Sequence, residues 1–246
     1  MIAVLSPHLD DAVLSCWSLL TAPEPVLVVN VFTGSPPPGS GARWWDRVTG
    51  ASDSASRMRE RLAEDRAALA LAGREALHLD LLEVQYRDGV APPDLEQVID
   101  GVLPAGYALY APAALGDHAD HALVRDAALA LQVGGTAVTL YADLPHAIED
   151  GWPTLVAGEA GDERVDAGWD AVLAPTGVVA TAASVRELDL EAWARKVDAV
   201  RAYTSQYPAL DALAFRPLLH PDTLRYEVFW AIAPGVRCGG RGALRR

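Results

Sequence analysis

The hydrophobic positions of this chain follow two repeating patterns. Short runs rich in β-branched residues alternate with longer segments in which apolar residues recur at helical spacing. The apolar runs predict strands over residues 2–5, 25–32, 76–81, 108–112 and 137–142. The helical spacing predicts helices over residues 54–72, 117–132 and 190–203. This alternation is typical of an α/β fold with a mostly parallel central sheet flanked by helices.

Glycine and proline mark where this regular pattern stops. Residues 33–53 form a long loop rich in both, and loops of that length inside compact domains tend to be functional or disordered. Residues 144–188 show little periodicity, which indicates a smaller irregular C-terminal lobe with short strands. We therefore expect a single domain over residues 1–240, followed by a flexible tail over residues 241–246.

Composition narrows the class of partner. The chain has 246 residues, 51% of them hydrophobic, so it can bury a substantial core. Its formal net charge of -13 argues against nucleic acid or an anionic membrane surface as the main partner, and a small molecule suits it better. No apolar run is long enough to span a bilayer.

The N-terminus and the cysteines predict a cytoplasmic location. Asp10 and Asp11 interrupt the first apolar stretch where a signal peptide would need its hydrophobic region. Cys16 and Cys238 are the only cysteines, too few for a disulfide framework. Lys196 is the sole lysine while arginine and alanine abound, which suggests a GC-rich bacterial genome.

Two polar clusters follow predicted strands. "PHLDD" (7–11) ends the first strand and "GDHADH" (116–121) follows the fourth, so both lie at the carboxyl edge of the sheet, where ligands bind in open α/β folds. His118 and His121 are three residues apart and share one face of a helix start. Two imidazoles and a carboxylate suit zinc with an open position for water. The alternatives are a helix N-cap for the first cluster and a solvated helix end for the second.

The two clusters also carry a family resemblance. "SPHLDDAVLS" resembles the first motif of the PIG-L/LmbE family of zinc-dependent N-deacetylases, and "GDHADHALVRDAA" is similar to the second. The likeness continues through residues 61–73, 140–147, 202–206 and 225–230, so it covers most of the chain. It implies a Rossmann-like α/β fold.

The resemblance also implies roles for individual residues. The metal ligands fall on His8, Asp11 and His121, the general base on Asp10, and the histidine that helps polarise the carbonyl on His118. The implied cofactor is Zn²⁺, and another divalent metal such as Fe²⁺ is compatible with the same ligands. Zinc would activate a water for attack on an acetamide carbonyl, and Asp10 would accept the proton.

Two positions depart from the family pattern. Ala12 stands where many members have glutamate, and Asp117 stands where glycine is common. Neither departure removes a ligand, but Asp117 alters the charge beside His118. We expect Asp117 and Asp120 to favour the imidazolium form of His118.

Substrate contacts are expected from other residues at the same edge. Trp44 and Trp45 lie in the long loop beside Arg43, and exposed aromatic rings suit a sugar ring with its amphipathic faces. A hydrophobic plug is the alternative for the two tryptophans. Arg87 and His146 are also assigned to the substrate side of the site.

The predicted activity is hydrolysis of an N-acetyl or other N-acyl group on an amino sugar or a glycosylated small molecule. One alternative is an amidase that acts on a non-sugar natural product or a thiol conjugate. Another is a non-catalytic, metal-containing binding module, although Asp10 argues against that reading because such a module has no need of a base. A homo-oligomer is compatible with the sequence.

Overall fold

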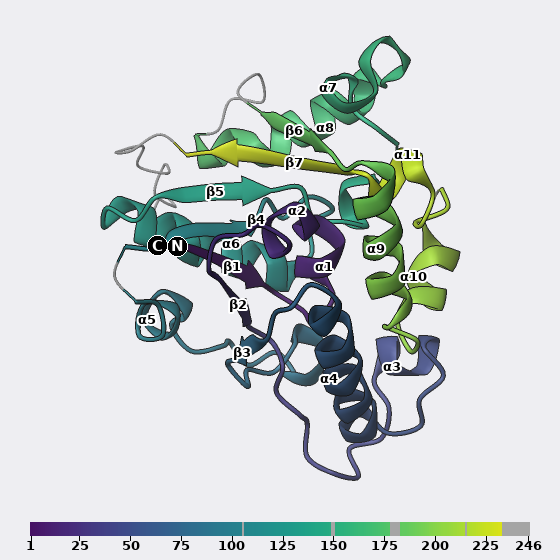
Figure 1. The fold of residues 1–246 in the computed structure, drawn as a ribbon. Helices are drawn as coiled ribbons and strands as arrows, with labels where there is room; N and C mark the ends of the chain where they lie inside the picture. The colour runs from purple at the N-terminus through teal and green to yellow at the C-terminus, as the bar shows by residue number, and fades with distance from the viewer. Residues whose placement is uncertain (105, 149–150, 178–182, 215, 233–246) are drawn as a thin grey trace.

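A mixed central sheet organises the molecule (Figure 1). The computed structural model describes residues 1–104, 106–148, 151–177, 183–214 and 216–232. Within them the sheet has seven strands in the order β3-β2-β1-β4-β5-β7-β6. The strands are β1 (Ile2–Ser6), β2 (Val26–Asn30), β3 (Ala76–His78), β4 (Ala108–Pro112), β5 (Val138–Tyr141), β6 (Ser184–Glu187) and β7 (Tyr226–Ala231).

The middle of the sheet is parallel and buried on both faces. β1 pairs in parallel with β2 and with β4, so that Val4 lies opposite Val28 on one side and Tyr110 on the other. Val4 and Val28 are fully buried. Strands covered on both faces are apolar throughout rather than alternating, which is why these runs stand out in the sequence.

Helices cover both faces of the sheet. α9 packs with α4 and with α1 over one face, and α5 and α6 cover the other (Figure 1). The α-helices are α1 (Asp11–Ser15), α2 (Trp17–Leu20), α3 (Trp44–Val48), α4 (Ser54–Leu71), α5 (Leu95–Asp100), α6 (Ala119–Val133), α7 (Thr154–Ala157), α8 (Glu163–Leu173), α9 (Leu190–Arg201), α10 (Tyr207–Leu213) and α11 (Pro221–Leu224). A 3₁₀ turn, η1 (Val84–Tyr86), follows β3. No described helix is long and apolar enough to cross a membrane.

Side-chain caps place the helix starts close to where the sequence predicts them. Asp53 accepts a hydrogen bond from the Ser56 amide at 2.8 Å at the start of α4, and Asp189 caps α9 through the Ala192 amide in the same way. α4 ends just before Gly73, whose φ of +68° disfavours other residues.

The predicted fold class, α/β with a mostly parallel sheet, is confirmed. The sequence did not predict β7, which runs antiparallel to β5, and it gave no bounds for β6, which runs antiparallel to β7. Residues 144–188 were expected to hold short strands, but their described part contains α7, α8 and only one strand, β6. The predicted tail over 241–246 and Cys238 lie outside the described residues.

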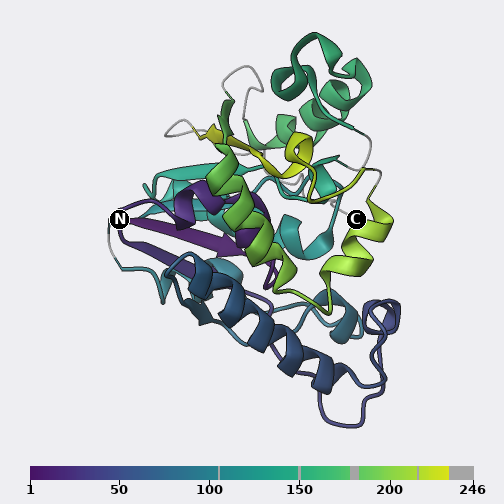
Figure 2. The same cartoon turned by 45° about the vertical axis from the view of Figure 1, so that its right-hand side comes forward.

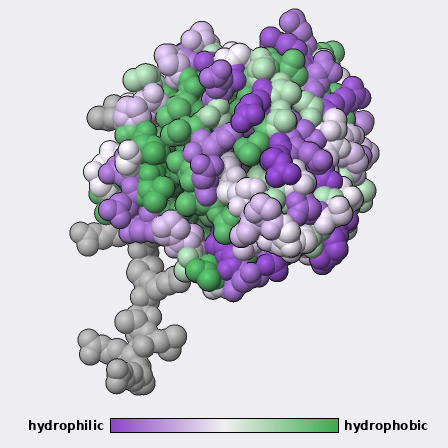
Figure 3. Space-filling view, turned by 90° about the horizontal axis from the view of Figure 1, so that it is seen from below, coloured by the Kyte–Doolittle hydropathy of each residue, from purple (hydrophilic) through white to green (hydrophobic). Residues whose placement is uncertain are grey.

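The strand order fixes where a ligand can bind. From β1 the chain continues to β2 on one side, and from β4 it continues to β5 on the other side. Because the two connections diverge, a crevice forms at the carboxyl ends of the neighbouring strands β1 and β4. In Figures 1 and 2, α3 and α10 lie beside each other at that end of the sheet. Seen from below, apolar side chains gather over the left half of the molecule (Figure 3), on the side where β3, an edge strand, lies in Figure 1.

Candidate active site

The loop that follows β1 carries three of the polar side chains. His8, Asp10 and Asp11 lie between β1 and the first turn of α1. Asp10 occupies the N-cap position of α1, but its side chain makes no capping hydrogen bond. The N-cap alternative therefore does not account for this carboxylate. Asp10 lines a cavity instead, and the residue is 8% exposed.

Three donor atoms from the two clusters converge on one point. His8 Nδ1 lies 3.2 Å from His121 Nε2 and 3.5 Å from Asp11 Oδ2, and the last two atoms are 3.4 Å apart. Nitrogen and oxygen ligands about 2.0–2.2 Å from a tetrahedral ion are separated by roughly 3.3–3.6 Å. The residues present therefore fit a divalent metal without rearrangement.

Buried carboxylates hold the far side of each imidazole. His8 Nε2 lies 3.2 Å from Asp120 Oδ2, and His121 Nδ1 lies 2.7 Å from Asp143 Oδ2. Asp120 also forms an ion pair with Arg87 at 2.8 Å. Because each carboxylate accepts the proton on one ring nitrogen, the other nitrogen is left as the electron-pair donor toward the metal position.

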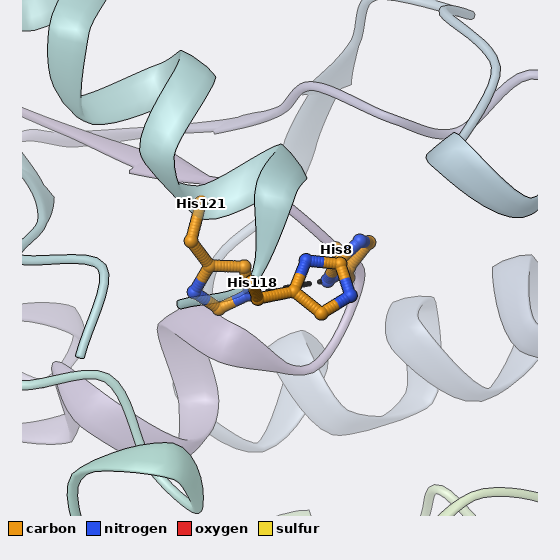
Figure 4. Close-up of side chains that lie close together, drawn as sticks. All are labelled: His8, His118 and His121. Atoms are coloured by element: carbon orange, nitrogen blue, oxygen red, sulfur yellow. Dashed lines mark hydrogen bonds between the residues drawn. The ribbon is translucent and has the colours of Figure 1, made fainter. Parts of the chain in front are cut away.

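His118 lies beside these donors but does not complete the same triangle. Its ring centroid is 4.8 Å from that of His8 and 5.0 Å from that of His121 (Figure 4). A set of His8, His118 and His121 is also close enough to be considered as metal ligands, with donor atoms within 4.8 Å of one another. We favour the set with Asp11, since its separations of 3.5 Å or less already match a tetrahedral ion.

The expected imidazolium form of His118 is wrong. Burial, reinforced by the neighbouring His8, His121 and His146, lowers the pKa of His118 to about 3. Asp120 raises the pKa of His118, as expected, but this effect is outweighed, and Asp120 itself binds His8 and Arg87. His118 Nδ1 accepts a hydrogen bond from the Asp120 backbone amide at 3.3 Å. The neutral ring therefore carries its proton on Nε2 and remains a hydrogen-bond donor.

The two adjacent aspartates differ in proton affinity. Burial and the charge of Asp11 raise the pKa of Asp10 to about 6, with Arg61 and His8 opposing the shift. Burial would also raise the pKa of Asp11, but His121 and His8 hold it well below its usual range. The Asp10 carboxyl is therefore suited to exchanging a proton near neutral pH, while the Asp11 carboxyl stays ionised, the form that could bind a metal.

A cavity of about 400 Å³ opens over these groups. Its polar lining includes the residues called the His/Asp cluster below: His8, Asp10, Asp11, His118 and Asp120. Arg61 and Glu83 also line the cavity, and Arg61 donates a buried hydrogen bond to Glu83. The other lining residues are Leu14, Trp44, Trp45, Val84, Gln85, Pro145, His146, Gln206, Leu210, Leu213 and Ala214. The most exposed of them, Trp44, Val84 and Leu213, are apolar, so the site is polar where it is buried and apolar toward solvent.

The structure brings only some of the predicted substrate residues to this cavity. Trp44, Trp45 and His146 line it. Arg43 does not, because it forms an ion pair with Asp88 at 2.7 Å. Arg87 does not either, since its guanidinium binds Asp120 and lies 5.1 Å from the Phe32 ring centroid. Arg87 therefore supports a carboxylate of the cluster rather than facing the cavity.

Sequence reasoning missed several residues of the site. Asp143 lies two residues beyond the end of β5, as the two polar clusters follow β1 and β4, so its place after a strand end was the available signal. Arg61 and Glu83 gave no such signal because one lies within α4 and the other in a loop. Asp117, which departs from the family pattern, has a φ of +58°, a left-handed conformation that aspartate tolerates better than most residues.

The fold and the site together define an α/β protein in which two histidines and an aspartate, whose separations fit a metal ion, lie beside a cavity. The chain matches no family model. It is 34% identical over 167 residues to the 2'-N-acetylparomamine deacetylase of Streptomyces fradiae. This match covers 58% of the chain and spans little more than half of the relative, 57% of its length.

Solved structures of similar fold cover nearly the whole chain. The zinc-inhibited form of teicoplanin deacetylase has a TM-score of 0.63 at 26% identity, over 94% of this chain and 97% of that one. The pseudoaglycone deacetylase Dbv21 has a TM-score of 0.66 at 27% identity, over 96% and 98%. All three similar proteins are deacetylases.

Proposed function

We propose that this protein is a metal-dependent N-deacetylase that acts on an N-acetylated amino sugar within a glycosylated small molecule. The observation that carries the proposal is the convergence of His8 Nδ1, His121 Nε2 and Asp11 Oδ2 within 3.5 Å of one another, with Asp10 beside them. This arrangement provides a metal position and an adjacent carboxylate of suitable proton affinity, the two requirements for hydrolysing an amide with water.

The similar proteins support the choice of substrate class. One is a deacetylase of 2'-N-acetylparomamine, and the two similar solved structures are deacetylases of teicoplanin and of a pseudoaglycone. We extend this likeness to membership of the PIG-L/LmbE family, on the two motifs at 6–15 and 116–128. The alternative of an amidase with a non-sugar substrate has no specific support in the site.

His8, Asp11 and His121 would hold the metal, which we take to be zinc or another divalent ion such as Fe²⁺. When bound, such an ion supplies Lewis-acid and water-activating chemistry. Asp120 and Asp143 orient the two imidazoles toward it through their far ring nitrogens.

The remaining residues move protons and position the amide. With a pKa near 6, Asp10 is ionised at neutral pH, accepts the proton of the attacking water and returns it to the departing amine. Neutral His118 donates its Nε2 proton in a hydrogen bond to the acyl oxygen, where negative charge develops. The products are acetate and a free amine, so one water is consumed for each amide cleaved.

We also propose that one domain carries the activity. Among the described residues, one large buried cluster joins side chains from Ala3 in β1 to Ile232 beyond β7, and a small second cluster holds Leu9, Met58 and Tyr86. A cytoplasmic location and assembly into a homo-oligomer stay predictions from the sequence.

The test combines metal removal with one substitution. Acetate release from an N-acetylated amino sugar glycoside should disappear after chelation and return when zinc is added. Asp10→Asn should keep its zinc but lose turnover, while Asp170→Asn, a change at an exposed position on α8, serves as the matched control. Undiminished acetate release by the chelated protein, or none from any N-acetylated amino sugar at full metal occupancy, would overturn the proposal.

A further inference from the structure

The mouth of the cavity exposes large apolar side chains. Trp44 of α3 is 63% exposed, Val84 of η1 is 41% exposed and Leu213 of α10 is 61% exposed, and all three line the cavity. Leu210 and Ala214 line it beside Leu213. These five residues are called the apolar mouth below. Three separate segments of the chain supply it, so it is a product of the fold rather than of one sequence run.

α10 turns its apolar stripe toward the cavity. Gln206, Leu210, Leu213 and Ala214 follow one another at intervals of four, three and one residues, a spacing that places them on one face of a helix. All four line the cavity, and α10 itself contains no buried residue. The apolar stripe of a surface helix ordinarily covers the core. Here Leu210 packs against the core and also lines the cavity, while Leu213 lines the cavity and is left exposed.

Hydrogen bonds fix the aromatic side of the mouth. Trp45 Nε1 donates to Gln206 Oε1 at 2.7 Å, which joins α3 to the residue at the start of α10. The Trp45 amide donates to Gln85 Oε1 at 3.3 Å, which joins α3 to η1. Trp44 packs on Trp45 with ring centroids 5.7 Å apart. An exposed ring held in this way can bind a ligand with little loss of side-chain entropy.

We infer that the apolar mouth binds an aryl or alkyl aglycone that the amino-sugar substrate carries on the side away from its acyl group. The inference rests on the proposed function, which places the acyl group at the His/Asp cluster. Mouth and cluster belong to one cavity of about 400 Å³, a size that holds drug-sized ligands. A two-carbon acyl group leaves most of that space to the rest of the substrate, and the apolar outer wall favours an apolar group there.

The experiment compares glycosides that differ only in the aglycone. Acetate release is measured from the methyl and phenyl glycosides of N-acetylglucosamine, and kcat/KM should be about five- to tenfold higher for the phenyl compound through a lower KM. Leu213→Ser and Trp44→Ala should bring the phenyl-to-methyl ratio close to one. Leu190→Ser is the matched control, since Leu190 is 63% exposed on α9 and lies outside the cavity lining, and it should keep the ratio.

Two further measurements test whether something other than the aglycone binds at the apolar mouth. An N-octanoyl methyl glycoside that gains as much as the phenyl glycoside would assign the mouth to the acyl chain and overturn the inference. A dimer in sedimentation that only Leu213→Ser dissociates would assign it to a second copy, with the same consequence.

The two proposals fail in different ways. Equal kcat/KM for the methyl and phenyl glycosides in the native protein would overturn the aglycone site and leave deacetylation standing. Absence of acetate release from every glycoside would count against the proposed function. In that case calorimetric binding of the phenyl glycoside still tests the mouth, because Leu213→Ser should weaken it about five- to tenfold and unchanged binding would overturn it.

Discussion

Replacing Asp10 and Asp11 one at a time by asparagine should change the stability of the metal-free protein in opposite directions. Burial and the charge of Asp11 raise the pKa of Asp10 from 3.8 to about 6. At 1.36 kcal/mol for each pKa unit, the ionised carboxylate costs the folded state about 3 kcal/mol at neutral pH. Asp10→Asn removes that charge, so it should stabilise the protein while lowering turnover by roughly two to four orders of magnitude.

The gain has a defined dependence on pH. Below pH 3.8 the Asp10 carboxyl is protonated in the folded and unfolded chains alike, so the cost is absent. The cost grows between pH 3.8 and about 6 and is complete above that range. At pH 7.5 the melting temperature of Asp10→Asn should therefore exceed that of the native protein by about 6–12 °C. Near pH 4 the two should melt together.

Asp11 should show the reverse behaviour. His121 and His8 hold its pKa below the ordinary value, so its ionised form stabilises the fold above the unfolded pKa. Asp11→Asn should lower the melting temperature at pH 7.5 and lose metal affinity, with part of the rate restored by excess zinc.

Calorimetric melting of the chelated variants from pH 4 to 8, with metal analysis of the loaded proteins, checks both predictions. A stability gain of Asp10→Asn that persists at pH 4 would show that removal of the charge is not its cause. If Asp10→Asn is the variant that loses metal and is rescued by zinc, the roles of the two aspartates are reversed.

Three other predictions concern the metal and the base. His121→Ala should lose most bound metal, and full zinc occupancy in that variant would contradict the ligand assignment. Asp143→Asn should keep the fold by circular dichroism but bind zinc about 10- to 100-fold more weakly, because Asp143 orients His121; unchanged affinity would refute this role. Below pH 6, kcat/KM should fall about tenfold for each pH unit as Asp10 is protonated. Arg61→Gln should move this acidic limb of the pH–rate profile to higher pH, because Arg61 lowers the pKa of Asp10. An acidic limb at the same pH in both proteins would show that Arg61 does not have that role.

Much of the fold could be predicted because its signals are local. β1, β2 and β4 are short apolar runs, and the N-caps of α4 and α9 and the Gly73 stop of α4 lie next to those helices in sequence. β7 was missed and β6 was not delimited because their pairing is antiparallel and follows no strand–helix alternation. The pattern that predicts the centre of the sheet therefore does not extend to its edge.

The sequence by itself determined which residues could bind a metal, because histidine and aspartate at the ends of two parallel strands must meet at one edge of the sheet. Only the tertiary structure decided their distances, the partners Asp120 and Asp143, and the placement of Arg87 away from the cavity. It also decided that His118 is neutral and that Asp10 has a raised pKa. The physical reason is that burial and interactions between charges depend on separations in space, and residues far apart in the chain set those separations.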